Sequence, residues 1–317
     1  MFVEPMDILS VHPIRKNKKQ KKSFRNDVLF YAESLGYDAK VEKGSYGAKN
    51  IVLGDPEKAK YLVTAHYDTP ASIGIPNFMT PCNAFAFIVF QIFIVAVFIL
   101  IAAAVALVTN LITDNRELAF DLMMLAYWLT LILMLFGPAN RNNANDNTSG
   151  VVTVLEMAKS MPKNLRSNVC FVLFDLEEAG LIGSSSYRKT HKKETETQII
   201  LNMDCVGDGN EIVFFPTKKL RKDGKKLEWL YGAIGRYGDK TIDVREKGFA
   251  MYPSDQMNFP YGVGIAALNR KKGIGLYLDK IHTKKDTNLD ITNVNILRAC
   301  LTTLVTQQNQ EVTHEQR

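Results

Sequence analysis

Imidazole and carboxylate side chains recur at the ends of apolar segments of this sequence. They are His66, Asp68, Asp146, Glu177, Glu178, Asp204 and His282. Two imidazoles and three carboxylates can bind two divalent cations, with one carboxylate bridging ions about 3.5–4 Å apart. Each residue alone is a weak signal, because a strand-end histidine is usually hydrogen-bonded and an acidic pair before a helix usually complements the helix dipole. Their joint order along the chain predicts a two-metal site.

Apolar strands position several of these side chains at one edge of a sheet. His66 and Asp68 end "LVTAHYD", Glu177 follows "NVCFVLFDL", and Asp204 ends "IILNMD". The carboxyl ends of parallel strands form the binding crevice of open α/β sheets. Asp146 stands just before a helix that begins near residue 148, in the polar turn "NDNTSG". We therefore expect the cluster to assemble at the carboxyl edge of the sheet.

Alternating helical and strand patterns predict the fold class. Helices are expected from Ser23 to Gly36, near residues 184–192 and 225–237, and after Asp290. The segments "KNIVLG" and "KYLVTAHYD" flank "DPEKA", a pattern typical of a β-hairpin. The sequence thus predicts an α/β protein: a three-layer α/β/α sandwich with a mostly parallel central sheet and antiparallel strands at its ends.

Two long apolar runs interrupt this pattern. Residues 84–108 contain no charged residue, and residues 118–136 contain one, Asp121. The first run would form a helix of about 37 Å, enough to cross a hydrocarbon layer of about 30 Å. A buried helical hairpin is the weaker alternative, because an uncharged run of this length exceeds ordinary core helices. We expect a transmembrane hairpin within an inserted segment, residues 75–139.

The remaining residues form a basic tail, 1–22, and a catalytic domain, 23–74 and 140–317. The short linker between the two runs carries a net charge of −1, whereas the flanks carry the basic residues near the N-terminus and Arg141. The positive-inside rule then predicts a multi-pass membrane protein whose domain and both termini are cytoplasmic. Four cysteines without CxxC spacing agree with a reducing compartment.

A basic run lies near the N-terminus, in a chain whose formal net charge is +6. It contains Arg15, Lys16, Lys18, Lys19, Lys21, Lys22 and Arg25. A solvated tail is the first interpretation and contact with anionic lipid the second, since each basic residue near such a surface contributes roughly 1 kcal/mol. No nucleic-acid partner is expected, because no recognisable binding module accompanies the run.

Six short motifs resemble a known family. "AHYDT", "NDNTSG", "FDLEEAGLIGSSSY", "NMDCVG", "PSDQMNF" and "IHTKKDT" match, in order, the motif series of the M28 family of di-zinc aminopeptidases. The resemblance covers residues 40–68 and 140–317. It departs from compact family members between the first two motifs, where this chain holds the apolar hairpin. The fold that it implies is a zinc exopeptidase-like sandwich.

The resemblance also implies a ligand set for two Zn²⁺ ions. His66 and Asp204 would bind one zinc, Glu178 and His282 the other, and Asp146 would bridge the two. Carboxylate-rich sites also accept Co²⁺ or Mn²⁺.

Catalytic roles follow for the two remaining acids of the cluster. Asp68 would orient His66 by a hydrogen bond, and Glu177 would be the general base that activates water. Gln256 stands where family members often carry histidine after the aspartate, and altered substrate contacts are expected there.

The sequence therefore predicts a membrane-anchored di-zinc metallopeptidase, an aminopeptidase acting on peptides with a free N-terminus. A single-zinc enzyme similar to glutaminyl cyclase and a non-catalytic membrane receptor on the same fold are the alternatives. We also expect the metal crevice to lie close to the bilayer, because the hairpin directly precedes Asp146. Ala102 and Ala106 have the small-xxx-small spacing of helix pairs, which is a weak indication of a homo-oligomer.

Overall fold

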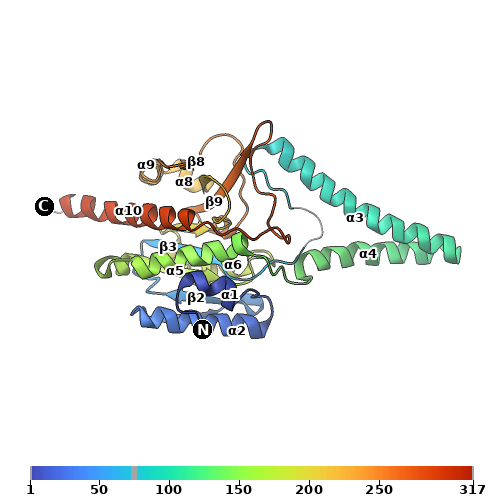
Figure 1. Ribbon diagram of the computed structural model, residues 1–317, viewed down its shortest axis with the longest axis horizontal. Helices are drawn as coiled ribbons and strands as arrows, with labels where there is room; N and C mark the ends of the chain where they lie inside the picture. Colours follow the sequence, from blue (N-terminus) through green and yellow to red (C-terminus); the bar gives the residue numbers. More distant parts are fainter. Residues whose placement is uncertain (1, 73–76, 316–317) are drawn as a thin grey trace.

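A central β-sheet forms the body of the protein in the computed structural model, which describes residues 2–72 and 77–315 (Figure 1). The strand order is β1-β2-β4-β3-β5-β9-β6-β8-β7, with β10 paired to β9. The strands are β1 (Ala39–Lys43), β2 (Lys49–Leu53), β3 (Tyr61–His66), β4 (Val169–Phe174), β5 (Ile199–Met203), β6 (Glu211–Pro216), β7 (Gly235–Tyr237), β8 (Lys240–Val244), β9 (Gly262–Lys271) and β10 (Gly275–Tyr277).

The sheet is parallel where the candidate site residues lie. Strand β3 pairs in parallel with β4 and β5, and β5 pairs in parallel with β9. Antiparallel pairs flank this centre: β1 with β2, β2 with β4, β6 with β9, and β7 with β8. The sheet is thus more mixed than the mostly parallel one expected. The predicted hairpin of β2 and β3 is wrong, because β4 lies between them and takes the hydrogen bonds of both.

Helices cover both faces of the sheet, as predicted for three layers. One face packs against α2 (Lys18–Ser34), α5 (Gly150–Ser160), α9 (Gly224–Tyr231) and α10 (Ile291–Glu315), and the other against α6 (Ile182–Thr190). Val63 belongs to the first core and its neighbour Leu62 to the second, as alternation along a strand requires. The short helices are α1 (Ile8–Val11), α7 (Lys192–Thr195) and α8 (Lys218–Lys222).

The N-terminal basic residues are part of the folded body. Helix α2 begins at Lys18 rather than after Ser23, because Asn17 caps it: the Asn17 side chain accepts from the backbone N–H of Gln20. Arg15, Lys21 and Arg25 are buried. The interpretation of this run as a solvated tail is therefore wrong for these three residues. Arg15 precedes α2, and Lys21 and Arg25 lie on α2 among exposed lysines.

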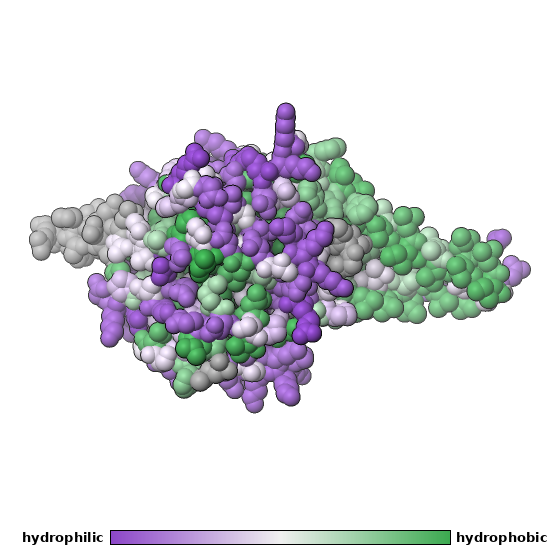
Figure 2. All heavy atoms as spheres, viewed as in Figure 1, coloured by the Kyte–Doolittle hydropathy of each residue, from purple (hydrophilic) through white to green (hydrophobic). Residues whose placement is uncertain are grey.

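The two apolar runs form a pair of long helices that project from the body (Figure 1). They are α3 (Ala84–Thr113) and α4 (Arg116–Phe136), 30 and 21 residues long. Both are long and apolar enough to cross a membrane, and only 17% and 6% of their most apolar windows are buried. Figure 2 shows the contrast between these hydrophobic helices and the largely polar surface of the body. The expected linker is mostly helical, since α3 continues to Thr113, and Ala102 is buried within the hairpin.

The root of the hairpin is fixed to the loop that carries His282. Ala71 and Ala139 form a β-bridge, so the chain entering the insertion lies beside the chain leaving it. The side-chain amide of Asn140 donates to the carbonyl of Thr283 at 2.9 Å, and that of Asn142 donates to Lys284. The first residues of the inserted segment, 75 and 76, lie outside the described residues. The hairpin root is therefore coupled to one of the candidate metal ligands.

Candidate metal centre

The sheet brings the predicted ligands together at the carboxyl edge of its parallel strands. His66 is the last residue of β3, Glu177 and Glu178 follow β4, and Asp204 follows β5. These strands are neighbours, so their ends meet at one place. Asp146 precedes α5, and His282 lies in the loop between β10 and α10.

Asp146 lies between the two histidines. Its Oδ1 is 3.3 Å from His66 Nε2, and its Oδ2 is 3.0 Å from His282 Nε2. The carboxylate is buried, 3% exposed, and its peptide bond to Asn147 is cis. One oxygen directed to each imidazole is the arrangement that a bridging carboxylate needs.

The other carboxylates divide between the same two histidines. Asp204 Oδ1 lies 3.8 Å from His66 Nε2, and Glu178 Oε2 lies 3.7 Å from His282 Nε2. Glu177 Oε2 lies 4.0 Å from His66 Nε2. The ligand atoms of His66, Asp146 and Glu178 lie within 4.8 Å of one another, as do those of His66, Glu177 and Asp204. Asp204 and Glu177 therefore lie beside His66, and Glu178 lies within reach of both histidines.

Asp68 faces His66 and also binds the backbone of the acidic pair, Glu177 and Glu178. Its Oδ1 is 3.5 Å from His66 Nδ1 and also accepts the backbone N–H of Glu177 at 3.1 Å. Its Oδ2 accepts the N–H of Glu178 at 3.3 Å. The two atoms of the predicted hydrogen bond to His66 lie 3.5 Å apart, and His66 Nδ1 makes no hydrogen bond among the described residues. The backbone contacts to the acidic pair were not expected from the sequence, because β4 had no assigned place beside β3.

The donor set fits divalent cations. His66 Nδ1, His282 Nδ1 and Glu178 Oε1 are buried and lack a hydrogen-bond partner among the described residues. Burial raises the pKa of Glu178 well above its usual value, and the charge of Asp146 raises it further. Burial likewise raises the pKa of Glu177, against the opposing influence of His66. Acids that crowd in this way need positive charge, which divalent cations supply.

The two histidines and the acids of the cluster shift one another's pKa values. Burial would lower the pKa of His66, but Glu177, Asp146 and Asp204 together raise it well above its usual value. Burial would raise the pKa of Asp146, but hydrogen bonds to His282 and His66 bring it below the usual range. Cations bind neutral imidazole and ionised carboxylate, so metal binding at this cluster would release protons and depend on pH.

Three residues of the site had no role in the sequence analysis. Asp286 accepts the backbone N–H groups of Asn145 and Asp146 at 2.7 and 3.0 Å. Tyr252 donates its hydroxyl to the carbonyl of Asp204 at 3.0 Å. Asp255 is fully buried, neither of its oxygens has a hydrogen-bond partner among the described residues, and burial raises its pKa to about 7. Asp286 lies in the motif "IHTKKDT" and Asp255 in "PSDQMNF". Their place in these motifs is the sequence signal that could have identified them.

Left-handed backbone recurs beside the ligands. Leu176, Cys205 and His282 have φ values of 57°, 58° and 60°. This conformation costs an L-residue roughly 1–2 kcal/mol, and such strain collects at functional sites. Leu176 precedes Glu177, Cys205 follows Asp204, and His282 is itself a candidate ligand, so each of these turns stands in or beside the cluster.

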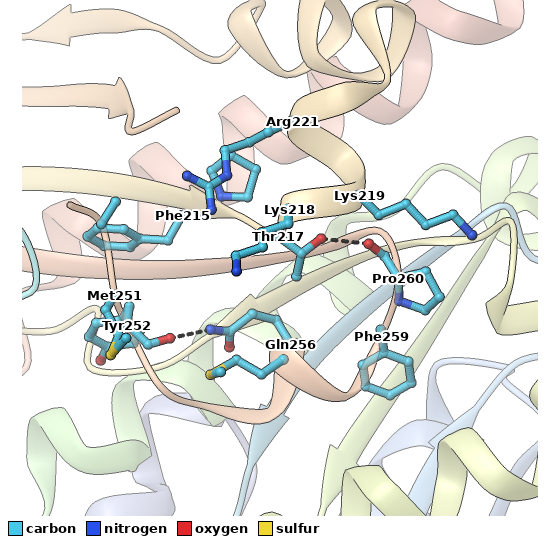
Figure 3. Close-up of a pocket in the computed structure, with 13 residues that line it drawn as sticks. Phe215, Thr217, Lys218, Lys219, Arg221, Met251, Tyr252, Gln256, Phe259 and Pro260 are labelled. Carbon is cyan, nitrogen blue, oxygen red and sulfur yellow. Dashed lines mark hydrogen bonds between the residues drawn. The ribbon is translucent and has the colours of Figure 1, made fainter. Parts of the chain in front are cut away.

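A cavity of about 470 Å³ lies beside Gln256, with Phe215, Met251 and Phe259 in its wall (Figure 3). Gln256 is buried, its Nε2 donates to the carbonyl of Tyr252, and its Oε1 accepts from Asn202. The glutamine thus joins the loop before it to β5. Both polar atoms of its amide are therefore engaged within the protein.

The fold and this cluster define a class: α/β proteins with a candidate two-metal centre at the carboxyl edge of a central sheet. Residues 125–306, more than half of the chain, match the model of peptidase family M28. The chain therefore belongs to the M28 peptidase family. The matched residues include four of the five predicted metal ligands, and His66 lies outside them.

Individual relatives share parts of the chain or its fold. Aminopeptidase YwaD of Bacillus subtilis is 41% identical over 69 residues, which is 20% of this chain and 15% of that protein. The glutaminyl cyclase structure of Porphyromonas gingivalis aligns with a TM-score of 0.61 and 16% identity, over 96% of this chain and 97% of that one. The LapA aminopeptidase of Legionella pneumophila aligns with a TM-score of 0.57 and 15% identity, over 95% and 68%. At these identities the structures show a shared fold.

Proposed function

We propose that this protein is a membrane-anchored di-zinc metallopeptidase that removes residues from the free N-terminus of peptides. One observation carries the proposal: the two oxygens of Asp146 face the Nε2 atoms of His66 and His282, with one further carboxylate beside each histidine. Five ligands in this order provide two adjacent cation sites with a shared carboxylate. Membership of the M28 peptidase family supports the assignment.

The ligands would hold one ion at His66 and Asp204 and one at Glu178 and His282. When bound, such ions polarise a scissile carbonyl and lower the pKa of a water from 15.7 towards about 7. Asp68 accepts hydrogen bonds from the backbone N–H groups of Glu177 and Glu178. These bonds fix the backbone of the acidic pair, so that the two side chains point in different directions. Glu177 can then serve the proton transfer while Glu178 serves the metal.

Glu177 is the proposed general base. Its carboxylate lies beside His66, 4.0 Å from His66 Nε2, and only 13% of the side chain is exposed. From this position it would accept a proton from the attacking water and deliver it to the leaving amine nitrogen. Proton transfer by a positioned side chain contributes about 10²–10⁴-fold to a rate.

Replacement of this base tests the proposed function. We expect Glu177→Gln to retain the zinc content of the wild type and to lose about 10²–10⁴-fold in kcat on aminoacyl anilides. Asp146→Asn is the matched change in a ligand and should lose zinc as well as activity. The measurements are elemental analysis and initial rates of the full chain in detergent. Equal activity of Glu177→Gln and wild type would exclude the assigned base, and one zinc per chain would favour the cyclase-like alternative.

Membrane anchoring rests on the length and exposure of α3 and α4. If the hairpin spans a bilayer, the metal centre lies close to it, because Asn140 donates to Pro70 at the hairpin root and to Thr283 in the loop of His282. The expectation of a membrane-proximal crevice is supported by these contacts. The substrate would then approach along the membrane surface.

A further inference from the structure

A second cavity, beside the loop that carries Glu177, is lined by cationic side chains. Its volume is about 540 Å³, and it lies between the first turns of α2 and the turn from β1 to β2. The cationic side chains in its wall are Lys16, Lys18, Lys21, Lys22, Arg25 and Lys49. Asp175 is the single acidic residue that lines it. The cavity therefore concentrates positive charge well beyond what its own wall neutralises.

The one carboxylate in the wall is already occupied. Asp175 accepts from Lys21 Nζ at 2.6 Å and from the backbone N–H groups of Leu176 and Lys49. Arg25 donates from one nitrogen to the hydroxyl of Tyr67. The ammonium groups of Lys18, Lys22 and Lys49 have no carboxylate partner among the residues that the structure describes. These cations repel one another across a shared hollow unless an anion enters.

The chemistry of the wall fits a phosphate group. Lysine and arginine are the side chains that bind phosphate, by charge-assisted hydrogen bonds. Helical spacing places Lys18, Lys22 and Arg25 on one face of α2, while Lys49 comes from β2. Donors from two separate elements can thus surround one phosphate from different sides, which a row of lysines on a single exposed helix cannot do.

The position of the cavity identifies the source of that phosphate. Lys16 Nζ donates to the carbonyl of Leu135 at 3.4 Å, in the last turn of α4. The cavity wall is thus attached to the end of an apolar helix. In a membrane-spanning hairpin this end lies at the level of the lipid headgroups. At the other side of the wall, Leu176 directly precedes Glu177.

We propose that this basic cavity binds the phosphate of an anionic phospholipid headgroup, beside the point where α4 joins the catalytic domain. The inference rests on the proposed membrane insertion of the hairpin and not on peptidase activity. A bound headgroup would fix the α2 end of the domain at the membrane surface. It would also place lipid next to the loop that carries the proposed base.

Short-chain lipids test the proposal on the full chain in an uncharged detergent. We expect dioctanoyl phosphatidic acid to bind at least about tenfold more tightly than dioctanoyl phosphatidylcholine, measured by native mass spectrometry. Lys22→Gln/Lys49→Gln should weaken binding of the anionic lipid about thirtyfold, roughly fivefold for each lysine. Lys18→Gln/Lys22→Gln changes α2 alone and should weaken it similarly. Lys192→Gln/Lys193→Gln removes the same charge from exposed positions on α7 and should bind as the wild type.

The outcomes separate this proposal from the peptidase assignment. Glu177→Gln should bind the lipid as the wild type does, whatever its hydrolytic rate. Equal binding by the wild type and both cavity variants would overturn the proposal. Inorganic phosphate or glycerol phosphate that binds as tightly as the dioctanoyl lipid would overturn the lipid as source and leave a soluble anion site. Equal loss in the α7 control would show non-specific attraction and would also overturn it.

Discussion

Asp286 illustrates how a residue without a metal-binding role can determine the geometry of a ligand. Its two oxygens accept the backbone N–H groups of Asn145 and Asp146, in a buried position. The loop that carries Asp146 depends on these bonds, because its residues 146 and 147 depart from helical backbone angles. The orientation of the Asp146 carboxylate is therefore set from a distant part of the chain.

Removal of Asp286 should weaken both folding and metal binding. Asp286→Ala leaves two buried N–H groups without acceptors, at about 1–3 kcal/mol each, so we expect a loss of about 2–6 kcal/mol in stability. Zinc affinity should fall about 10–100-fold, as is usual for residues that orient ligands. Asp286→Asn keeps an acceptor oxygen and should recover part of both. Thermal unfolding measures the change in stability, and zinc titration measures the change in affinity. Wild-type zinc affinity in Asp286→Ala would contradict the proposed orientation of Asp146 by Asp286.

Arg15 connects three parts of the chain next to the site. Its guanidinium donates to the carbonyls of His12 and Tyr67 and to the side chains of Asn143 and Thr148. Burial lowers its pKa to about 10, against the opposing charges of Asp68 and Asp146. The cation remains protonated at neutral pH.

Replacement of Arg15 should be among the most destabilising changes in the N-terminal segment. Arg15→Met leaves buried acceptors unsatisfied, and loss of one partner from such a buried charged network costs about 3–5 kcal/mol. Arg15→Lys keeps the charge without the planar array of donors and should recover only part of the stability. Lys19→Met, on the exposed side of α2, should change stability by less than about 0.5 kcal/mol. A denaturant or thermal unfolding series in detergent provides the comparison.

At the scale of elements, periodicity predicted most of the fold, and sheet order was the part that it could not supply. The strand "EIVFFP" and the last helix lie where the sequence placed them. The wrong hairpin of β2 and β3 had a good turn between two apolar runs, but β4, from more than 100 residues later, binds both strands. Long-range pairing of this kind leaves no trace in the local pattern. The start of α2 was missed because a lysine-rich first turn resembles a disordered tail, although Asn17 and Gln20 form a capping box.

The candidate site was more predictable than the sheet, because ligand chemistry is carried by residue type. All five predicted ligands, with Asp68 and Glu177, lie in one cluster. What the sequence could not supply were the contacts that depend on sheet order, such as Asp68 to the backbone of the acidic pair. The buried Asp255 and Tyr252 were missed for the same reason. Their roles depend on which loops face each other across the edge.

Metal removal should loosen the elements that meet at this edge. The ends of β3, β4 and β5 and the loops of Asp146 and His282 share the cluster, whose acids repel one another without cations. A ligand at 100 times its Kd stabilises the folded state by about 2.7 kcal/mol. Chelation should therefore lower Tm by about 5–11 °C, at roughly 2–4 °C per kcal/mol. Added zinc should restore the Tm of the wild type but not that of Asp146→Asn. An unchanged Tm after verified loss of zinc would contradict the prediction that the bound metal stabilises these elements.

At the scale of the whole molecule, the surface of the hairpin is hydrophobic and that of the body is largely polar (Figure 2). The tip of the hairpin holds Asp114, Arg116 and Glu117, while the body carries most of the basic residues. We expect the tip on the outer side of the membrane and the body in the cytoplasm. A cysteine introduced at Asn115 should react with a membrane-impermeant maleimide in intact cells, and one at Lys192 only after permeabilisation. The reverse pattern would contradict the predicted orientation.

The short connection from α4 to Asp146 has a consequence for the choice of substrate. About ten residues separate Phe136 from Asp146, which at roughly 3.5 Å per extended residue allows at most about 35 Å between the helix end and the cluster. If the hairpin spans a bilayer, a polypeptide anchored in that bilayer would need an unfolded stalk of only about ten residues to bring its N-terminus to the cluster. An anchored protein whose folded domain begins close to the lipid would not reach the cluster. The length of the unfolded stalk, and not only the identity of the N-terminal side chain, would then determine which proteins are substrates.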